Sequence, residues 1–102
     1  MDFHTLCTGC RTYRRFKQKQ IPEEILDELL ENARIANSAM NGQPLRYVLV
    51  KSQETVKKLQ PYFHFAAALP KELGQPKKGE QPTAFIILCT EGPETPWTGI
   101  DI

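Results

Sequence analysis

The sequence lacks the features that mark several large classes of protein. None of its 102 residues belongs to an apolar run near the roughly 20 residues needed to span a bilayer, so we expect no membrane association. Lysine and arginine number 13 against 12 aspartate and glutamate, and this balance leaves no global field to attract nucleic acid. The aromatic residues are not interleaved with the basic ones, which makes nucleic-acid binding the least favoured function.

Common catalytic signatures are also missing. There is no P-loop, no Gly-x-Gly-x-x-Gly fingerprint, no catalytic pair of acidic residues and no Ser/His/Asp arrangement. Three cysteines are an odd number, which argues against a disulfide framework and favours a reducing, cytoplasmic compartment. Asp2 and His4 stand where a secretory leader would begin, so we expect no signal peptide.

The helical patterns are clear in two places. Residues 22–36 predict a helix, with Pro22 at its first position and two glutamates in its first turn. Its apolar positions form one continuous stripe that we expect to be buried: Ile25, Leu26, Leu29, Leu30, Ala33 and Ala36. Asp2 is expected to cap a second, shorter helix over residues 3–10, whose buried face would comprise Phe3, Leu6 and Cys10.

The remaining elements are two strands and further short segments. Residues 46–50 and 83–89 read as strands buried on both faces, because both are almost continuously apolar. Ser52 is expected to cap a helix over residues 53–60 that Pro61 ends. Residues 61–81 have no clear period, 70–82 read as a mobile loop, and 97–102 could begin a helix. The order favours a single α+β or α/β domain, residues 1–102, whose two strands need further strands for a stable sheet.

Two polar stretches carry the functional signal. Residues 11–16 place three guanidinium groups within five positions, which suits a phosphate clamp. Residues 37–45 offer small and amide side chains that can hydrogen-bond a flat, polar heterocycle. Each stretch also has a plain structural reading, as a solvated basic surface or as a loop that satisfies its own backbone. Together they favour a phosphorylated aromatic ligand such as a mononucleotide.

The order and spacing of these stretches resemble the FMN-dependent nitroreductase family. There, an Arg-Ser-x-Arg-x-Phe element, a helix, a Pro-Ser-x-x-Asn-x-Gln-Pro-Trp element and a strand follow one another. This sequence has Arg-Thr-Tyr-Arg-Arg-Phe at 11–16 and Asn-Ser-Ala-Met-Asn-Gly-Gln-Pro-Leu at 37–45, so Asn37 and Leu45 depart from the pattern. The resemblance covers most of residues 3–51 and 82–102 and is weak between them. It implies an α+β, three-layer helix/sheet fold, of which this chain would be the N-terminal half, truncated before the central helix.

The resemblance also implies a function. It is that of an FMN-dependent NAD(P)H oxidoreductase, a flavoprotein that reduces nitroaromatic, quinone or related small-molecule acceptors and acts as a homodimer or with a complementing second half. No catalytic residue is expected, since the cofactor supplies the chemistry. The implied cofactor-binding residues fall in two groups, one for the FMN phosphate and one for the flavin of the neighbouring protomer: Arg11, Thr12 and Arg14, and Ser38, Ala39, Asn41 and Gln43.

Two alternatives remain at this point. The chain could be a non-catalytic fragment, or a partner subunit of a split nitroreductase-like protein. It could also hold a metal through His4, Cys7 and Cys10, with His64 or Cys89 as a fourth ligand. Because there is no second Cys-x-x-Cys, we favour buried, inert cysteines and predict no metal site.

Overall fold

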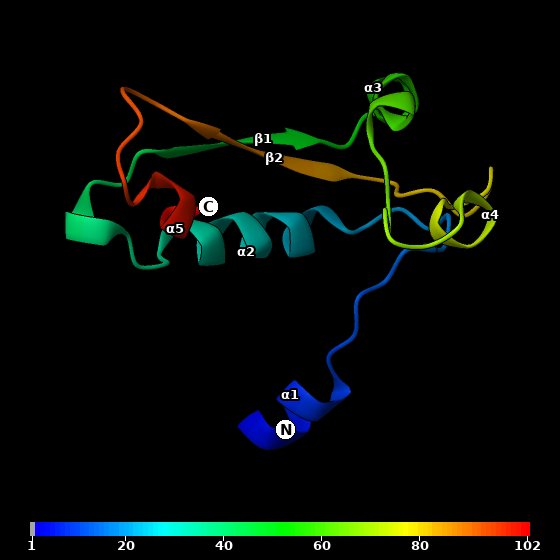
Figure 1. Ribbon diagram of the computed structural model, residues 1–102, viewed down its shortest axis with the longest axis horizontal. Coiled ribbons are helices and arrows are strands. Elements are labelled where there is room, and N and C mark those ends of the chain that lie inside the picture. Colours follow the sequence, from blue (N-terminus) through cyan, green and yellow to red (C-terminus); the bar gives the residue numbers. More distant parts are fainter. Residues whose placement is uncertain (1) are drawn as a thin grey trace.

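The computed structural model of the protein describes residues 2–102, and the side chains of residues 2–99 and 102. Figure 1 shows a two-stranded sheet with a long helix beside it and shorter helical segments at the periphery. In chain order the elements are α1 (Phe3–Gly9), α2 (Glu23–Arg34), η1 (Ala39–Asn41), β1 (Leu45–Val50), α3 (Gln53–Leu59), η2 (Gln60–Tyr62), α4 (Lys71–Gly74), β2 (Phe85–Thr90) and α5 (Thr98–Asp101).

The two strands pair antiparallel, with Leu45 opposite Thr90 at one end and Val50 opposite Phe85 at the other. Helix α2 runs along one side of this sheet (Figure 1). The Tyr47 hydroxyl of β1 donates a hydrogen bond of 3.3 Å to the Ala33 carbonyl of α2 and ties the two layers together. The expected α+β arrangement of helices and a sheet is therefore present.

Because both strand sequences are apolar, we expected the strands to be buried on both faces. This expectation was wrong. Along β1 the exposure alternates: Tyr47 and Leu49 are half-buried towards α2, while the Val48 side chain between them is 48% exposed. In β2, residues 88–90 are exposed. The physical reason is that, in the described part of the chain, a single helix layer lies against a sheet of two strands, so one face keeps its contact with water.

The apolar stripe of helix α2 is also only partly buried. Pro22 is the N-cap residue and not the first helical residue, as we had predicted it to be. The helix runs from Glu23 to Arg34 and is therefore shorter at both ends than the predicted range of 22–36. Leu26 is buried, but Ile25 and Leu29 are exposed at 48% and 47%. A two-stranded sheet is too narrow to cover a stripe this wide, so the expectation that the whole stripe is buried was wrong.

Helix α1 stands apart from the rest of the chain (Figure 1). Its predicted cap is confirmed, because the Thr5 N–H donates a hydrogen bond of 2.7 Å to the Asp2 carboxylate, which lowers the pKa of that carboxyl. Its predicted buried face is wrong: the Phe3 side chain is 81% exposed, and Leu6 and Cys10 are exposed as well. Among residues 2–102, no layer lies against this helix to bury an apolar face.

Specific contacts link residues 61–81, which we could not assign, and residues 70–82, which we expected to form a mobile loop, to other parts of the chain. Helix α4 and the turn η2 lie within or beside them. The Phe63 ring stacks on Phe85 of β2 with 4.4 Å between centroids. The amides of Gln60 and Gln75 donate hydrogen bonds of 2.8 Å to the carbonyls of Pro82 and Phe65. No local period is visible in this stretch because these contacts join positions that are 10 to 22 residues apart.

The apolar core is small for a chain of this length. The buried aliphatic side chains among the described residues are Leu26, Val50 and Val56. The radius of gyration is 16.0 Å, against roughly 13 Å for a compact domain of 100 residues. The accessible surface is 8486 Å², against roughly 5,800 Å² for a compact monomer of this mass. Within the described residues, none of the helices has the length and apolarity to cross a bilayer.

Candidate functional site

A cavity of about 490 Å³ opens where α2, the loop after it and β1 meet. Its size lies within the range of roughly 300–1,000 Å³ that is typical of small-molecule sites. Its polar lining comes from all three elements: Arg34 of α2, Asn37, Ser38 and Gln43 of the loop, and Arg46 and Tyr47 of β1. Hydroxyl and amide groups dominate the loop side, so this wall can both donate and accept hydrogen bonds.

The loop backbone turns sharply over a few residues. Met40, Asn41 and Gln43 adopt left-handed φ angles of 53°, 55° and 47°, which cost free energy for residues with a Cβ. The Ser38 hydroxyl accepts a hydrogen bond of 2.9 Å from the Gln43 N–H, and the Asn41 N–H donates one of 3.0 Å to the Ser38 carbonyl. Ser38 therefore holds both ends of the turn, and the loop's shape depends on it.

Both guanidinium groups of the cavity are already paired. Arg34 donates hydrogen bonds of 2.8 and 2.6 Å to the Glu31 carboxylate, which lowers the pKa of Glu31 and raises that of Arg34. Arg46 forms an ion pair with Glu91 and donates a hydrogen bond of 3.1 Å to the Gln43 carbonyl. With its cations compensated, the cavity suits a neutral polar heterocycle better than a phosphate group.

The second predicted group lies on the extended segment after α1. The Arg11 guanidinium donates hydrogen bonds of 2.8 and 2.7 Å to the carbonyls of Thr8 and Cys10, so it caps the end of α1. Thr12 is exposed and Arg14 is half-buried. Within residues 2–102, neither side chain forms a hydrogen bond or an ion pair, which leaves their donor groups open to a ligand.

The Arg15 side chain is exposed but forms contacts with other segments of the chain. Its guanidinium lies 3.6 Å from the Glu80 carboxylate and donates a hydrogen bond of 3.4 Å to the Leu73 carbonyl. It therefore fastens the basic segment to the region of α4, and its role in the structure differs from that of its neighbours.

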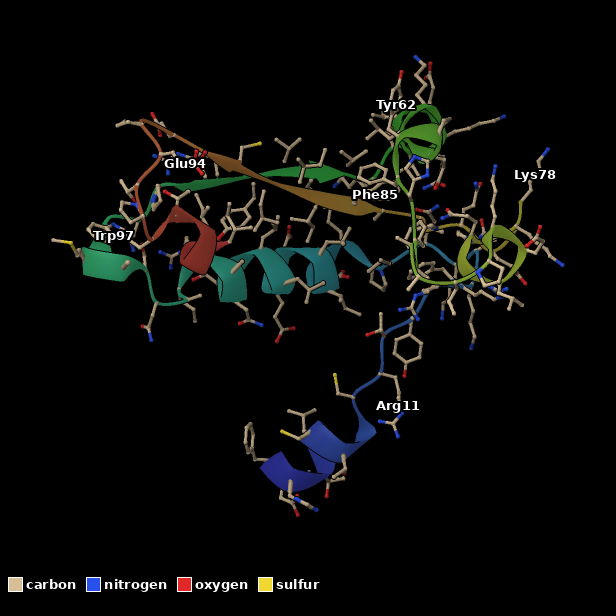
Figure 2. All side chains as sticks on the ribbon, in the orientation of Figure 1. Arg11, Tyr62, Lys78, Phe85, Glu94 and Trp97 are labelled. Atoms are coloured by element: carbon tan, nitrogen blue, oxygen red, sulfur yellow. The ribbon has the colours of Figure 1, made fainter. Side chains whose placement is uncertain are left out.

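The chain does not bring the two predicted groups together. The loop with η1 lies at one end of the molecule, whereas the segment of Arg11, shown in blue, extends away below the other half (Figures 1 and 2). Within the loop, Ser38 and Gln43 line the large cavity. Ala39 lines a neighbouring cavity of about 240 Å³, beside Trp97 and Thr98, and Asn41 lines neither.

Four polar residues of the cavity lining were not predicted from the sequence: Arg34, Asn37, Arg46 and Tyr47. Asn37 lies inside the stretch that we singled out, and we treated it only as a departure from the family pattern. Arg46 and Tyr47 were assigned to a strand alone, although they directly follow the loop. Their place at the point where a loop meets a strand was the signal that could have indicated them.

The cysteines are exposed, contrary to the buried state that we favoured. Among residues 2–102, no three His, Cys, Asp or Glu side chains form a group that could hold a metal ion. His4, Cys7 and Cys10, which follow one another at intervals of three residues along α1 and its C-cap, therefore form no such group.

Comparisons of the sequence with known proteins found a matching family and several relatives. The profile of the nitroreductase family matches residues 8–90. Proteins of Archaeoglobus fulgidus and Stutzerimonas stutzeri are 35% and 37% identical to the chain over 81 and 91 residues, or 79% and 89% of its length. Both bear the name "Putative NADH dehydrogenase/NAD(P)H nitroreductase".

The matched regions make up 41% and 43% of those two relatives, so the chain spans less than half of their length. A protein of the same name from Methanothermobacter thermautotrophicus is 28% identical over 79 residues, which cover 78% of the chain and 37% of that relative. No solved structure matches the chain significantly. The profile match over most of the sequence shows that the chain belongs to the nitroreductase family.

Proposed function

We propose that the chain is part of an FMN-dependent NAD(P)H oxidoreductase of the nitroreductase type, acting on small-molecule acceptors such as nitroaromatics or quinones. The names of the relatives support the reductant, because they specify NADH dehydrogenase and NAD(P)H nitroreductase. Bound FMN would supply the electron transfer, and the residues described above would bind and orient it. Three free cysteines fit the reducing conditions of the cytoplasm, the compartment that we propose.

The observation that carries the proposal is the division of donor groups between two separate regions. The segment of Arg11, Thr12 and Arg14 offers cationic and hydroxyl donors suited to a phosphate. The loop of Ser38 and Gln43 offers amide and hydroxyl groups, beside compensated cations, which suit a polar ring. These are the two chemical halves of a mononucleotide. Arg11 must first leave the carbonyls of Thr8 and Cys10 to reach a phosphate.

A partner copy reconciles this division with a single binding site. If two chains pair, the loop of one can approach the basic segment of the other, as the family resemblance implies. The accessible surface supports pairing, because 8486 Å² exceeds that of a compact monomer by roughly 2,600 Å². A standard interface buries roughly 800 Å² on each partner. We therefore propose a homodimer, or a complex with a second half, in which a third layer covers the open face of the sheet.

The test is a visible absorbance spectrum of freshly purified protein, followed by titration with FMN. We expect FMN to co-purify with the chain and to give an absorbance band at about 450 nm. Arg14→Ala should weaken FMN binding roughly tenfold or more, because a hydrogen bond to a charged group contributes about 1.5–3 kcal/mol. Lys17→Ala is the matched control: it removes the same charge from an exposed side chain without an ion pair among the described residues. Equal losses for both variants would contradict the assignment of Arg14.

A second function is favoured by the small core and the partial coverage of the relatives. In it, the chain is a non-catalytic subunit that completes another polypeptide. Purified protein that binds no FMN at any concentration, yet forms a stable complex with a second chain that does, would support this function instead.

A further inference from the structure

Cys7 and Cys10 form a motif to which the proposed function gives no role. Cys7 lies in the last turn of α1, and Cys10 is the residue that caps it. The Cys10 N–H donates a hydrogen bond of 3.3 Å to the Cys7 carbonyl and closes the turn between them. Both thiols are exposed, so a small reagent in solution can reach either sulfur.

The spacing of three positions across this turn is close to what a disulfide requires. Side chains three positions apart on a helix have Cβ atoms about 5–6 Å apart, and a disulfide needs a Cβ separation of about 3.5–4.5 Å. Cys10 is the C-cap residue, and with ψ 135° no helical turn follows it to resist the small backbone adjustment that closes this gap. All residues from 2 to 11 are exposed, so no packed side chain opposes the movement.

The geometry points to a redox-active dithiol: Cys7 and Cys10 react with a hydroperoxide and form a reversible intramolecular disulfide. One thiol sulfur attacks a peroxide oxygen, the O–O bond breaks, and a sulfenic acid forms with release of water or an alcohol. The second sulfur then attacks the sulfenic sulfur, and the S–S bond forms with release of water. The two thiols lose two electrons and two protons, which the peroxide gains.

The site adjoins the proposed phosphate clamp but does not depend on it. Arg11 follows Cys10 directly, and its guanidinium bonds the carbonyls of Thr8 and Cys10. The disulfide would lock the turn that Arg11 caps. The third free thiol, Cys89, lies on β2, which is on the far side of α2 from α1 (Figure 1). It therefore serves as an internal control.

In the experiment, the reduced chain of 102 residues is exposed to one equivalent of hydrogen peroxide and its intact mass is followed. We expect the mass to fall by about 2 Da as two thiol hydrogens are lost, and the titratable thiols to fall from three to one. Trypsin should place the loss in the peptide that ends at Arg11, which contains both cysteines. Dithiothreitol should restore the starting mass.

Variants make the result decisive. Cys89→Ser should respond as the parent does. Cys7→Ser should not lose two hydrogens within one chain, and it should keep its fold because α1 stands apart from the sheet. Three thiols that survive peroxide, a disulfide that requires Cys89, or the same mass loss in Cys7→Ser would each overturn the inference. None of these readouts involves FMN, so this inference and the proposed function can fail separately.

Discussion

The Phe16 N–H donates a hydrogen bond of 2.8 Å to the Glu80 carbonyl, across 64 positions of the sequence. The same two segments are joined by the Arg15–Glu80 ion pair and by the Gln18 amide, which donates a bond of 2.8 Å to the Gln81 carbonyl. This junction anchors the segment of the proposed phosphate clamp to the chain just before β2. The position of Arg14 relative to the sheet therefore depends on residues beyond the clamp itself.

Removing the Arg15 side chain should loosen this junction. Arg15→Ala deletes the ion pair with Glu80 and the bond to the Leu73 carbonyl. Because both charged groups are over one-third exposed, we expect the free energy of unfolding to fall by only about 0.5–1 kcal/mol. The rate of amide hydrogen exchange in residues 71–82 should also rise. Chemical denaturation measures the change in the free energy of unfolding. Lys17→Ala, with the same charge change, should alter neither quantity.

The loop at the cavity should depend on one hydroxyl. Ser38→Ala removes the acceptor of the Gln43 N–H, and we expect it to lower the free energy of unfolding by about 0.5–1.5 kcal/mol. Ser52→Ala is the matched control, because Ser52 occupies an N-cap position without a side-chain cap bond. Thermal or urea unfolding of both variants measures the difference. A Ser52 variant as destabilised as the Ser38 variant would contradict the importance of this bond.

Two glycines should respond oppositely to alanine. A Cβ at Gly74 would lie 2.9 Å from the Ala66 carbonyl oxygen and 3.1 Å from that of Phe65, both backbone atoms. We expect Gly74→Ala to destabilise the protein by about 1–3 kcal/mol, as overpacking does. At Gly9, in α1, nothing lies within 4 Å of the added atom, so Gly9→Ala should raise the helicity of α1. Circular dichroism and urea unfolding distinguish the two effects.

The exposed ion pair between Lys51 and Glu23 should make the stability of the fold depend on pH. The Lys51 ammonium donates to the Glu23 carboxylate, and this bond lowers the pKa of Glu23. A carboxyl whose pKa is lower in the folded state adds stability above its unfolded pKa and loses it as pH falls through the folded value. The same bond raises the pKa of Lys51, so its contribution is present at neutral pH and is lost as pH rises through that raised value.

Lys51→Met should therefore reduce the decline of stability in acid. Unfolding by urea at a series of pH values measures this slope, and Lys57→Met, which removes a charge that forms no ion pair among the described residues, is the control. A residual slope should persist in Lys51→Met, because Asp2 and Glu31 also have lowered pKa values. An unchanged acid slope in Lys51→Met would show that the pair does not act in solution.

The sequence predicted those parts of the fold that local chemistry determines. Asp2 caps α1 and acidic residues begin α2, because these interactions join positions three or four apart. Burial was predicted poorly for Ile25 and Val48, since their exposure depends on how many layers cover them. Residues 61–82 were unreadable because their structure rests on contacts such as Phe63 on Phe85.

For the candidate site, the sequence indicated both polar stretches but not their arrangement. That Ser38 and Gln43 line a cavity follows from left-handed angles at three loop residues, none of which is glycine. Residue types alone do not predict such angles. Arg15 supports the junction because Glu80, which is far away in the sequence, lies beside it. The two neighbouring arginines therefore differ in a way that the local sequence does not predict.

Helix α1 stands apart from the sheet and is too short to be stable without a binding surface. Its seven residues are fewer than the roughly 12–15 that an isolated helix needs for marginal stability in water. An apolar surface that covered Phe3 and Leu6 would therefore stabilise the helix, and the conformational entropy lost on ordering it would oppose association. Docking of α1 should thus show the large negative heat-capacity change of folding coupled to binding, and its apparent affinity should weaken steeply on warming.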